Sequence, residues 1–249
     1  TLTSCNAWRN FRKGYYDATN RTAAHENIEV GYCDFRYNGE LGAYHGGGKA
    51  SSGATSYGNS AWFHHNFCDG NGMWHYCVSP DAAGEGGYWT GGIKLWGSGF
   101  GDKSKLGNSD GIVEYNVIHN SGPSGDNEMG SGIGLWLDES GSGNHLRYNY
   151  VTSSNSFGVV AEESDATWIY CNIAEGNGPS TNYVGNIGIW RHPEDCKTFN
   201  NVAIGPSYSG IVGHGSGTGN FHRNEFKNNI SINHDRALYA LRGAANVTS

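Results

Sequence analysis

Charged side chains, a basic excess and long apolar runs are all scarce in this sequence. Only 16% of the 249 residues are charged, and the formal net charge is −7. A basic stripe of the kind that binds nucleic acid is therefore missing. No apolar run approaches the roughly 18–20 residues of a transmembrane helix. We expect neither nucleic acid nor a membrane as a partner, and because no signal peptide opens the sequence we expect a processed or trimmed chain.

Glycine and aromatic residues are abundant instead. The chain contains 40 glycines, and 37% of its residues are hydrophobic and 13% aromatic. This composition is too apolar for disorder, and no Gly-X-Y period indicates collagen. It favours many short strands joined by frequent turns. We expect a single domain over residues 1–249, long enough to bury a substantial core.

One five-residue pattern recurs along the chain, with a small residue first, an aliphatic residue second and later repeats roughly 22 to 30 residues apart. Its copies are Gly92-Ile-Lys-Leu-Trp96, Gly134-Leu-Trp-Leu-Asp138, Gly158-Val-Val-Ala-Glu162, Gly188-Ile-Trp-Arg-His192, Gly210-Ile-Val-Gly-His214 and Ala237-Leu-Tyr-Ala-Leu241. Between these copies an asparagine followed by an aliphatic or aromatic residue recurs at a similar period, at Asn116, Asn149, Asn172, Asn201 and Asn229. Two markers with one period are typical of a solenoid.

The repeats predict strands rather than helices. Each contains two or three short strand-like runs, and apolar residues at helical spacing are not sustained. We expect a parallel β-solenoid in which equivalent positions of successive coils stack about 4.8 Å apart. The asparagines should form a ladder at a bend, because asparagine tolerates left-handed backbone and its amide can bond the next amide. Long loop insertions are expected on one face, at 77–91, 97–109 and 121–131.

The six cysteines form an even set without CxxC spacing. We expect disulfides because zinc-type spacing is absent. The expected pairs are Cys5–Cys33, Cys68–Cys77 and Cys171–Cys196, with six reduced, buried thiols as the alternative. Glycosylation sequons begin at Asn20, Asn229 and Asn246. Together these features predict a secreted glycoprotein.

The fifth position of the repeated pattern collects titratable side chains. In stacked coils it forms a ladder, and the third position has the same parity and forms a second ladder beside it. The fifth-position ladder is Trp96, Asp138, Glu162, His192 and His214, and the third-position ladder is Lys94, Trp136, Val160, Trp190, Val212 and Tyr239. We expect both ladders to face solvent in one strip. The opposite parity should face inward, at Ile133, Leu135, Leu137, Val159, Ala161, Ile189 and Arg191.

Asp138 and Glu162 should then lie about 5 Å apart on adjacent coils. A separation of about 5–5.5 Å suits a retaining glycosidase, in which one carboxylate attacks the sugar and the other protonates the leaving oxygen. Like charge nearby would raise the pKa of the acid. Alternatives are a merely solvated acidic face, calcium held by Asp138 and Glu162, or a transition metal held with His192 and His214.

The Asn-aliphatic coil pattern over residues 27–241 resembles the right-handed parallel β-helix superfamily that includes pectate lyases and polygalacturonases. Trp136-Leu-Asp138, followed 24 residues later by Glu162, is similar to the Trp-Leu-Asp and downstream Glu of a β-xylosidase family built on this fold. The resemblance implies that Asp138 is the nucleophile and Glu162 the acid/base. Gly213-His214-Gly215 is similar to a Gly-His-Gly segment of polygalacturonases.

Three functions remain open from the sequence. The first is a secreted glycoside hydrolase that acts on a polysaccharide or oligosaccharide without a cofactor. Its substrate would be bound by Trp96, Lys94, Trp136, Trp190, His192, His214 and Arg191. The second is a polysaccharide lyase on a uronic-acid polymer, with Lys94, Arg191 or a histidine as base and calcium as an aid. The third is a non-enzymatic glycan-binding or surface-fibre protein whose coils belong to a longer solenoid or stack into an oligomer or fibre.

Overall fold

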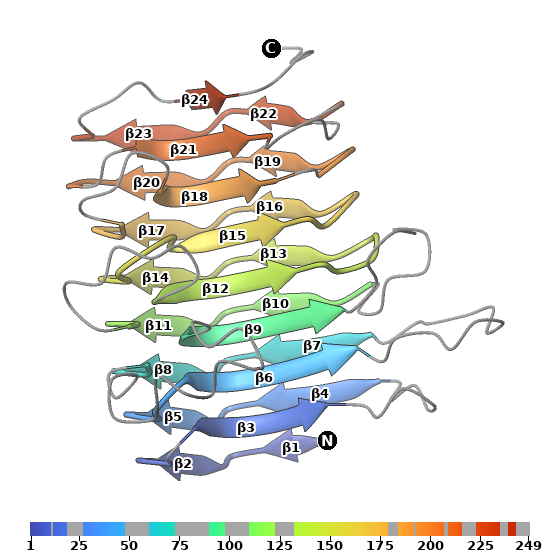
Figure 1. Ribbon diagram of the computed structural model, residues 1–249, viewed down its shortest axis with the longest axis vertical. Coiled ribbons are helices and arrows are strands. Elements are labelled where there is room, and N and C mark those ends of the chain that lie inside the picture. The colour runs from blue at the N-terminus through green and yellow to red at the C-terminus, as the bar shows by residue number, and fades with distance from the viewer. Residues whose placement is uncertain are drawn as a thin grey trace, which may run out of the picture.

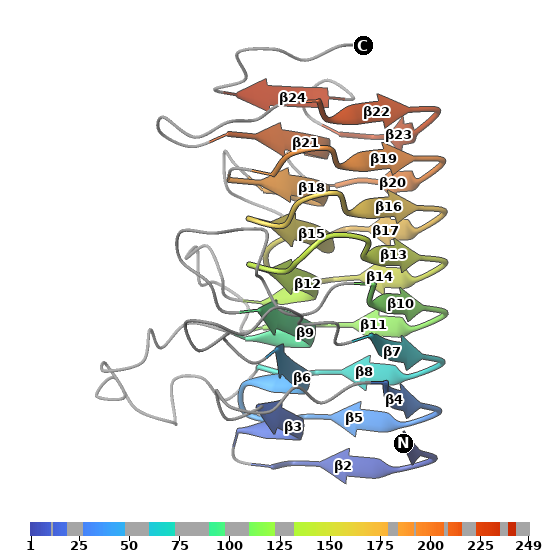
Figure 2. The ribbon, with the colours of Figure 1, turned by 90° about the vertical axis from the view of Figure 1, so that its right-hand side faces the viewer.

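The structure is a computed structural model that describes residues 1–10, 12–18, 27–47, 60–72, 90–97, 110–122, 132–178, 184–191, 193–206, 209–215, 223–234 and 239–242. Within these ranges the regular structure consists of three eight-stranded sheets. The sheets run side by side along the long axis of the molecule (Figures 1 and 2). No helix long and apolar enough to cross a membrane occurs in this part of the chain.

Every third strand along the chain belongs to the same sheet. Sheet A contains β1 (Leu2–Thr3), β4 (Ile28–Gly31), β7 (Ala61–His64), β10 (Ile112–Glu114), β13 (His145–Arg147), β16 (Trp168–Tyr170), β19 (Lys197–Phe199) and β22 (Glu225–Lys227). Sheet B contains β2 (Asn6–Trp8), β5 (Asp34–Arg36), β8 (Phe67–Asp69), β11 (Val117–His119), β14 (Tyr150–Thr152), β17 (Ile173–Glu175), β20 (Val202–Ile204) and β23 (Ile230–Ile232). Sheet C contains β3 (Lys13–Ala18), β6 (Leu41–Gly47), β9 (Gly91–Gly97), β12 (Ile133–Asp138), β15 (Val159–Glu162), β18 (Gly185–Trp190), β21 (Ser209–His214) and β24 (Tyr239–Arg242).

Each coil therefore gives one strand to each sheet, and neighbouring strands within a sheet are parallel, as for β12 with β15 and β10 with β13. This architecture is a right-handed parallel β-helix, and the predicted fold is confirmed. The three expected insertions fall largely outside the described residues.

The interior is filled by aliphatic residues in stacked columns. In sheet C, Leu135 pairs with Val159 and Leu137 pairs with Ala161, and none of the four is exposed. Ile187 and Ile189 continue these columns in β18. The predicted inward parity is confirmed for the aliphatic residues of these columns.

Two residues depart from that parity. Ile133 lies at the start of β12 opposite Gly91 and packs in a separate apolar cluster on the outer side of sheet C. Arg191 follows the end of β18 and is exposed rather than inward, because its backbone takes a left-handed φ of 63° that ends the strand alternation.

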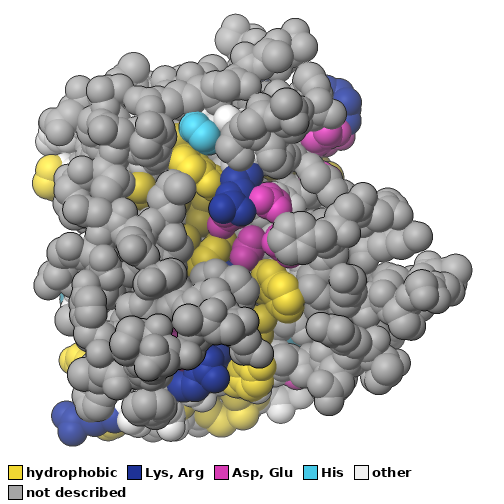
Figure 3. Space-filling model, in the orientation of Figure 1, with side chains coloured by type: hydrophobic (Ala, Val, Ile, Leu, Met, Phe, Trp, Pro, Cys, Tyr) yellow, Lys and Arg dark blue, Asp and Glu magenta, His cyan; other side chains and the backbone are white. Residues whose placement is uncertain are grey.

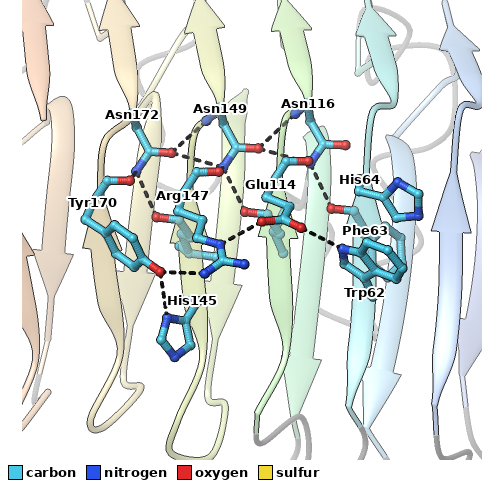
Figure 4. Close-up of polar contacts among 12 residues, drawn as sticks. Trp62, Phe63, His64, Glu114, Asn116, His145, Arg147, Asn149, Tyr170 and Asn172 are labelled. Atoms are coloured by element: carbon cyan, nitrogen blue, oxygen red, sulfur yellow. Dashed lines mark hydrogen bonds and ion pairs between the residues drawn. The ribbon is translucent and has the colours of Figure 1, made fainter.

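A column of buried asparagines turns the chain from sheet A to sheet B. The residue before each asparagine has a positive φ, for example 54° at Tyr115 and 55° at Cys171. Asn149 donates from its backbone N–H and from Nδ2 to Oδ1 of Asn172, both at 3.0 Å, and Figure 4 shows this bonding repeated at Asn116. The column comprises Asn66, Asn116, Asn149, Asn172, Asn201 and Asn229. The predicted ladder is confirmed.

The expected disulfides are not formed where both partners are described. Cys171 occupies the left-handed position at the corner, whereas Cys196 is buried in the main core, so the two thiols point into different surroundings. Cys33 takes the place of an asparagine in the ladder, and its Sγ accepts a hydrogen bond from the N–H of Cys5 without a bridge between them. Cys68 is buried, and Cys77 lies outside the described residues.

The sequon at Asn229 is also affected by the ladder. Its Nδ2 donates to the carbonyl oxygen of Thr198 and its Oδ1 accepts from Asn201, so the folded chain does not present this amide for glycosylation. Asn20 and Asn246 lie outside the described residues.

Candidate functional site

Strands β12 and β15 place the two predicted carboxylates side by side. The register pairs Asp138 with Glu162, and Trp96 of β9 pairs with Asp138. Paired positions of parallel strands direct their side chains to the same face. Both carboxylates therefore lie on the outer face of sheet C, and the predicted pairing is confirmed. The expectation that this ladder faces solvent is wrong for Asp138, which is only 6% exposed.

The next coil departs from the predicted ladder. Trp190, not His192, pairs with Glu162, and Trp190 pairs in turn with His214. Gly188, expected to begin this copy of the pattern, lies opposite Val160 in third position. His192 lies outside the described residues.

The last coil is shifted by one residue. Arg242 rather than Leu241 pairs with His214, so Tyr239 pairs with Ile211 and not with Val212. Tyr239 therefore leaves the third-position ladder of the strip. With Trp190 in fifth place, Asn186 takes the first place that Gly188 was expected to hold, so the residue type in first place does not fix where a copy of the pattern starts.

Trp136 and Trp190 are buried, so the predictions that they face solvent and bind substrate are wrong. They are only 3% and 5% exposed, and they belong to a second apolar cluster on the outer side of sheet C. This outer cluster comprises Ile133, Trp136, Phe157, Val160, Val184, Trp190 and Val212. Phe157 packs edge-on against Trp190 with ring centroids 5.5 Å apart. Sheet C therefore has a packed core on both faces along β12–β21.

Lys94 carries a charge into this apolar surrounding. Its side chain is fully buried, its Nζ donates to Oδ2 of Asp138 at 2.7 Å, and the same Nζ lies 3.2 Å from the ring centroid of Trp136. Burial lowers the pKa of Lys94, while the adjacent Asp138 opposes that change. A side chain that is buried and engaged in this way does not fit the predicted role of a substrate ligand or lyase base.

Glu162 is held from two sides. Its Oε2 accepts a hydrogen bond from Nε1 of Trp136 at 3.0 Å, and its Oε1 lies 3.0 Å from Nε of Arg191. Burial raises the pKa of Glu162 to about 7, and the negative charge of Asp138 adds to the rise, although Arg191 opposes it. Near neutral pH this carboxyl group is therefore divided between its protonated and ionised forms.

Arg191 and two further carboxylates complete the polar group. The Nη1 of Arg191 donates to Oε1 of Glu163 at 2.9 Å, and the guanidinium side chain is 45% exposed. Glu139, which follows Asp138, has its pKa raised to about 7 by burial and by the charge of Asp138. We define the sheet C strip as Trp96, Asp138, Glu139, Glu162, Glu163, Arg191 and His214.

The strip ends at an aromatic pair. The ring of His214 stacks on Trp190 with centroids 4.2 Å apart and planes inclined by 13°. Trp96 and His214 are both partly exposed. Figure 3 shows acidic, basic, histidine and apolar side chains gathered on this face of the molecule. The strip thus offers donors, acceptors and ring faces over several coils.

The donor set does not fit a metal ion. Among the residues that the structure describes, no group of three or more His, Cys, Asp or Glu side chains is arranged to hold one. At the pair considered as an alternative calcium site, Nζ of Lys94 lies against the carboxylate of Asp138 and Nε of Arg191 against that of Glu162. Cationic side chains therefore stand where that alternative would place a calcium ion.

Sequence reasoning missed the extension of sheet C towards the N-terminus. The register continues the third-position ladder from Lys94 to Tyr44 and Tyr16, whose rings stack at 5.4 Å. Lys13 places its Nζ 4.8 Å from the ring centroid of Tyr16 and 2.9 Å from Glu40. Glycine stands in first place in these coils too, in Gly14-Tyr-Tyr16 and Gly42-Ala-Tyr44, and this signal was overlooked.

Comparisons with known proteins add one similar structure. No protein-family model matches this chain. No curated protein sequence matches it either. A solved structure described as the siphovirus 9NA tailspike receptor binding domain is similar to it, with a TM-score of 0.45 and 13% sequence identity. The match covers 88% of this chain and 36% of that chain, so this chain spans little more than a third of its length.

Proposed function

We propose that this protein binds a carbohydrate along the sheet C strip. The observation that carries the proposal is the grouping of the exposed guanidinium of Arg191, the carboxylates of Glu162 and Glu163 and the partly exposed Trp96 on one face. Sugar hydroxyls both donate and accept hydrogen bonds, so they match a surface that presents both kinds of group. Side chains already fixed by ion pairs lose little freedom on binding.

The test is a carbohydrate array followed by calorimetric titration of each sugar that binds. Arg191→Ala should weaken binding at least about tenfold, as expected for a central contact residue. Arg223→Ala is the matched control, because Arg223 is another exposed arginine that pairs with two acidic residues, Glu194 and Asp195. If Arg191→Ala weakens the binding of none of the sugars that bind the wild-type protein, the proposal for the sheet C strip is rejected.

Hydrolysis is the second candidate function. It is favoured by one observation, the direct pairing of Asp138 with Glu162 together with the raised pKa of Glu162. In a retaining reaction Glu162 would protonate the glycosidic oxygen while Asp138 attacked the anomeric carbon, and water would later release the sugar. Nζ of Lys94 lies 2.7 Å from Oδ2 of Asp138, so Oδ1 is the oxygen that would attack.

Hydrolysis is tested by measuring new reducing ends on a panel of polysaccharides. Asp138→Asn should abolish turnover, because an amide is a poor nucleophile. Glu162→Gln should slow substrates with poor leaving groups far more than activated aryl glycosides, which need little protonation. A wild-type protein that binds a sugar but releases no reducing ends from it would leave the binding function and exclude hydrolysis of that sugar.

A further inference from the structure

The outer face of sheet A carries a second set of aromatic and polar side chains, remote from the sheet C strip. Trp62 of β7 and Trp168 of β16 are 42% and 38% exposed. The register places them in one column, in which Trp62 pairs with Ile112, Ile112 with His145, and His145 with Trp168. Three interstrand steps separate the two indoles, or about 14 Å along the solenoid axis.

Trp62 is held in place by its neighbours while part of its side chain stays exposed. Its indole stacks on the imidazole of His64 with centroids 3.9 Å apart, and its Nε1 donates to Oε1 of Glu114 at 3.0 Å. His64 is itself fixed by Glu29, whose Oε1 lies 3.2 Å from Nε2. Trp62 is 42% exposed although it stacks on His64, so part of its indole meets solvent.

Trp168 is supported from its neighbouring coils. His145 lies 5.0 Å from it with planes inclined by 55°, and Phe199 contacts it edge-on at 6.5 Å. Nζ of Lys197 lies 5.0 Å from the indole centroid. Both tryptophans are therefore ordered by packing before any ligand arrives, which lowers the entropy cost of binding.

A hydrogen-bonded row lies beside the column that joins the two indoles (Figure 4). Glu114 is buried and accepts from Trp62 at one oxygen and from Nε of Arg147 at the other, at 2.7 Å. Nη1 of Arg147 donates to the hydroxyl of Tyr170 at 2.8 Å, and Nδ1 of His145 lies 3.1 Å from that hydroxyl. Within the described residues these bonds use Nε and Nη1 of Arg147 and Nδ1 of His145. The guanidinium nitrogen Nη2 of Arg147 and the ring nitrogen Nε2 of His145 are not used by these bonds, so they remain for a ligand.

We propose that the outer face of sheet A is a second, non-catalytic binding site for a neutral oligosaccharide that lies along the solenoid axis from Trp62 to Trp168. The two indoles offer flat apolar surfaces to sugar rings, and the row between them offers donors to hydroxyl oxygens. The charge of Arg147 is balanced by Glu114 at 2.7 Å, so the centre of the site has no net charge that would call for an anionic sugar. The site does not depend on the carbohydrate site proposed on sheet C.

The test follows the indole N–H signals of Trp62 and Trp168 by nuclear magnetic resonance during titration with cellopentaose, mannopentaose and maltopentaose. At least one of these neutral pentasaccharides should shift both signals. Trp62→Ala and Trp168→Ala should each weaken that binding at least about tenfold. Because the ligand is uncharged, affinity should change little between low and high salt.

Two control variants separate this site from the others. Ile173→Ala removes an apolar side chain that is 43% exposed on sheet B, and it should leave binding unchanged. Arg191→Ala should also leave this binding unchanged, whereas it weakens binding at the sheet C strip. The inference is overturned if none of the three sugars moves the two indole signals, or if binding survives both tryptophan substitutions in folded protein.

Discussion

At the scale of single residues, Glu162 shows how burial and hydrogen bonding oppose each other. Nε1 of Trp136 and the guanidinium of Arg191 both favour its ionised form, yet its pKa rises to about 7. Burial among apolar side chains and the adjacent Asp138 favour the protonated form and outweigh them. A carboxyl group in this condition makes the stability of the fold depend on pH.

Stability should fall as the pH rises from about 5 to 8. The folded-state pKa of Glu162, about 7, is above the ordinary value of 4.5, so the folded chain binds more protons than the unfolded chain between these values. Glu162→Gln cannot ionise, so its free energy of unfolding should improve relative to wild type across this range, by on the order of 1–3 kcal/mol. Part of the dependence should remain, because Glu139 has its pKa raised in the same direction.

Urea unfolding at pH 5 and pH 8 measures this difference. Glu225→Gln is the control, since Glu225 is exposed on sheet A, away from these carboxylates. If the loss of unfolding free energy between pH 5 and pH 8 is as large in Glu162→Gln as in wild type, the raised pKa does not belong to this residue.

At the scale of elements, sheet C differs from an ordinary solenoid face because it is packed on both sides. Its inner residues join the main core, and its outer residues from β12 to β21 form the cluster around Trp136 and Trp190. The polar side chains of the strip therefore lie next to a packed apolar cluster on the same face of the sheet. We expect the outer cluster to stabilise the fold as a core does.

Trp190→Ala should lower the free energy of unfolding by about 3–5 kcal/mol, the cost of emptying a buried aromatic site. Trp168→Ala, which removes an indole that is 38% exposed on sheet A, should cost less than about 1 kcal/mol. Urea denaturation of both variants makes the comparison. Equal and small losses would mean that Trp190 is a surface residue and the outer cluster is not a core.

At the scale of the whole molecule, the asparagine column ties each coil mainly to its immediate neighbours. Asn149 bonds directly to Asn172, whereas Asn66 is separated from Asn172 by Asn116 and Asn149. Stability of such a stack is close to a sum of coil and nearest-neighbour contributions. The consequence is that substitutions in distant coils should act independently.

Asn172→Leu should cost about 1–3 kcal/mol, because it leaves neighbouring buried polar groups unpaired. Combined with Asn66→Leu, the losses should add within about 0.5 kcal/mol. Combined with Asn149→Leu, the total should be smaller than the sum, because the two single variants remove the same bonds. The measurement is the free energy of unfolding in urea for each single and each double variant. If the losses add equally well with Asn66→Leu and with Asn149→Leu, nearest-neighbour coupling is contradicted.

The sequence by itself determined the coil period, the strand type, the asparagine column and the pairing of Asp138 with Glu162. These features repeat, and stacking converts a repeat in sequence directly into contacts between coils. The register at Trp190 was not determined, because small residues compete for the first place of the pattern and only hydrogen bonding between strands selects one. Tertiary structure also decided that Trp136 and Trp190 are buried and that Lys94 binds Asp138. Parity assigns a side chain to a face of the sheet, but the burial of that face depends on what packs over it, and a single repeat carries no information about that covering.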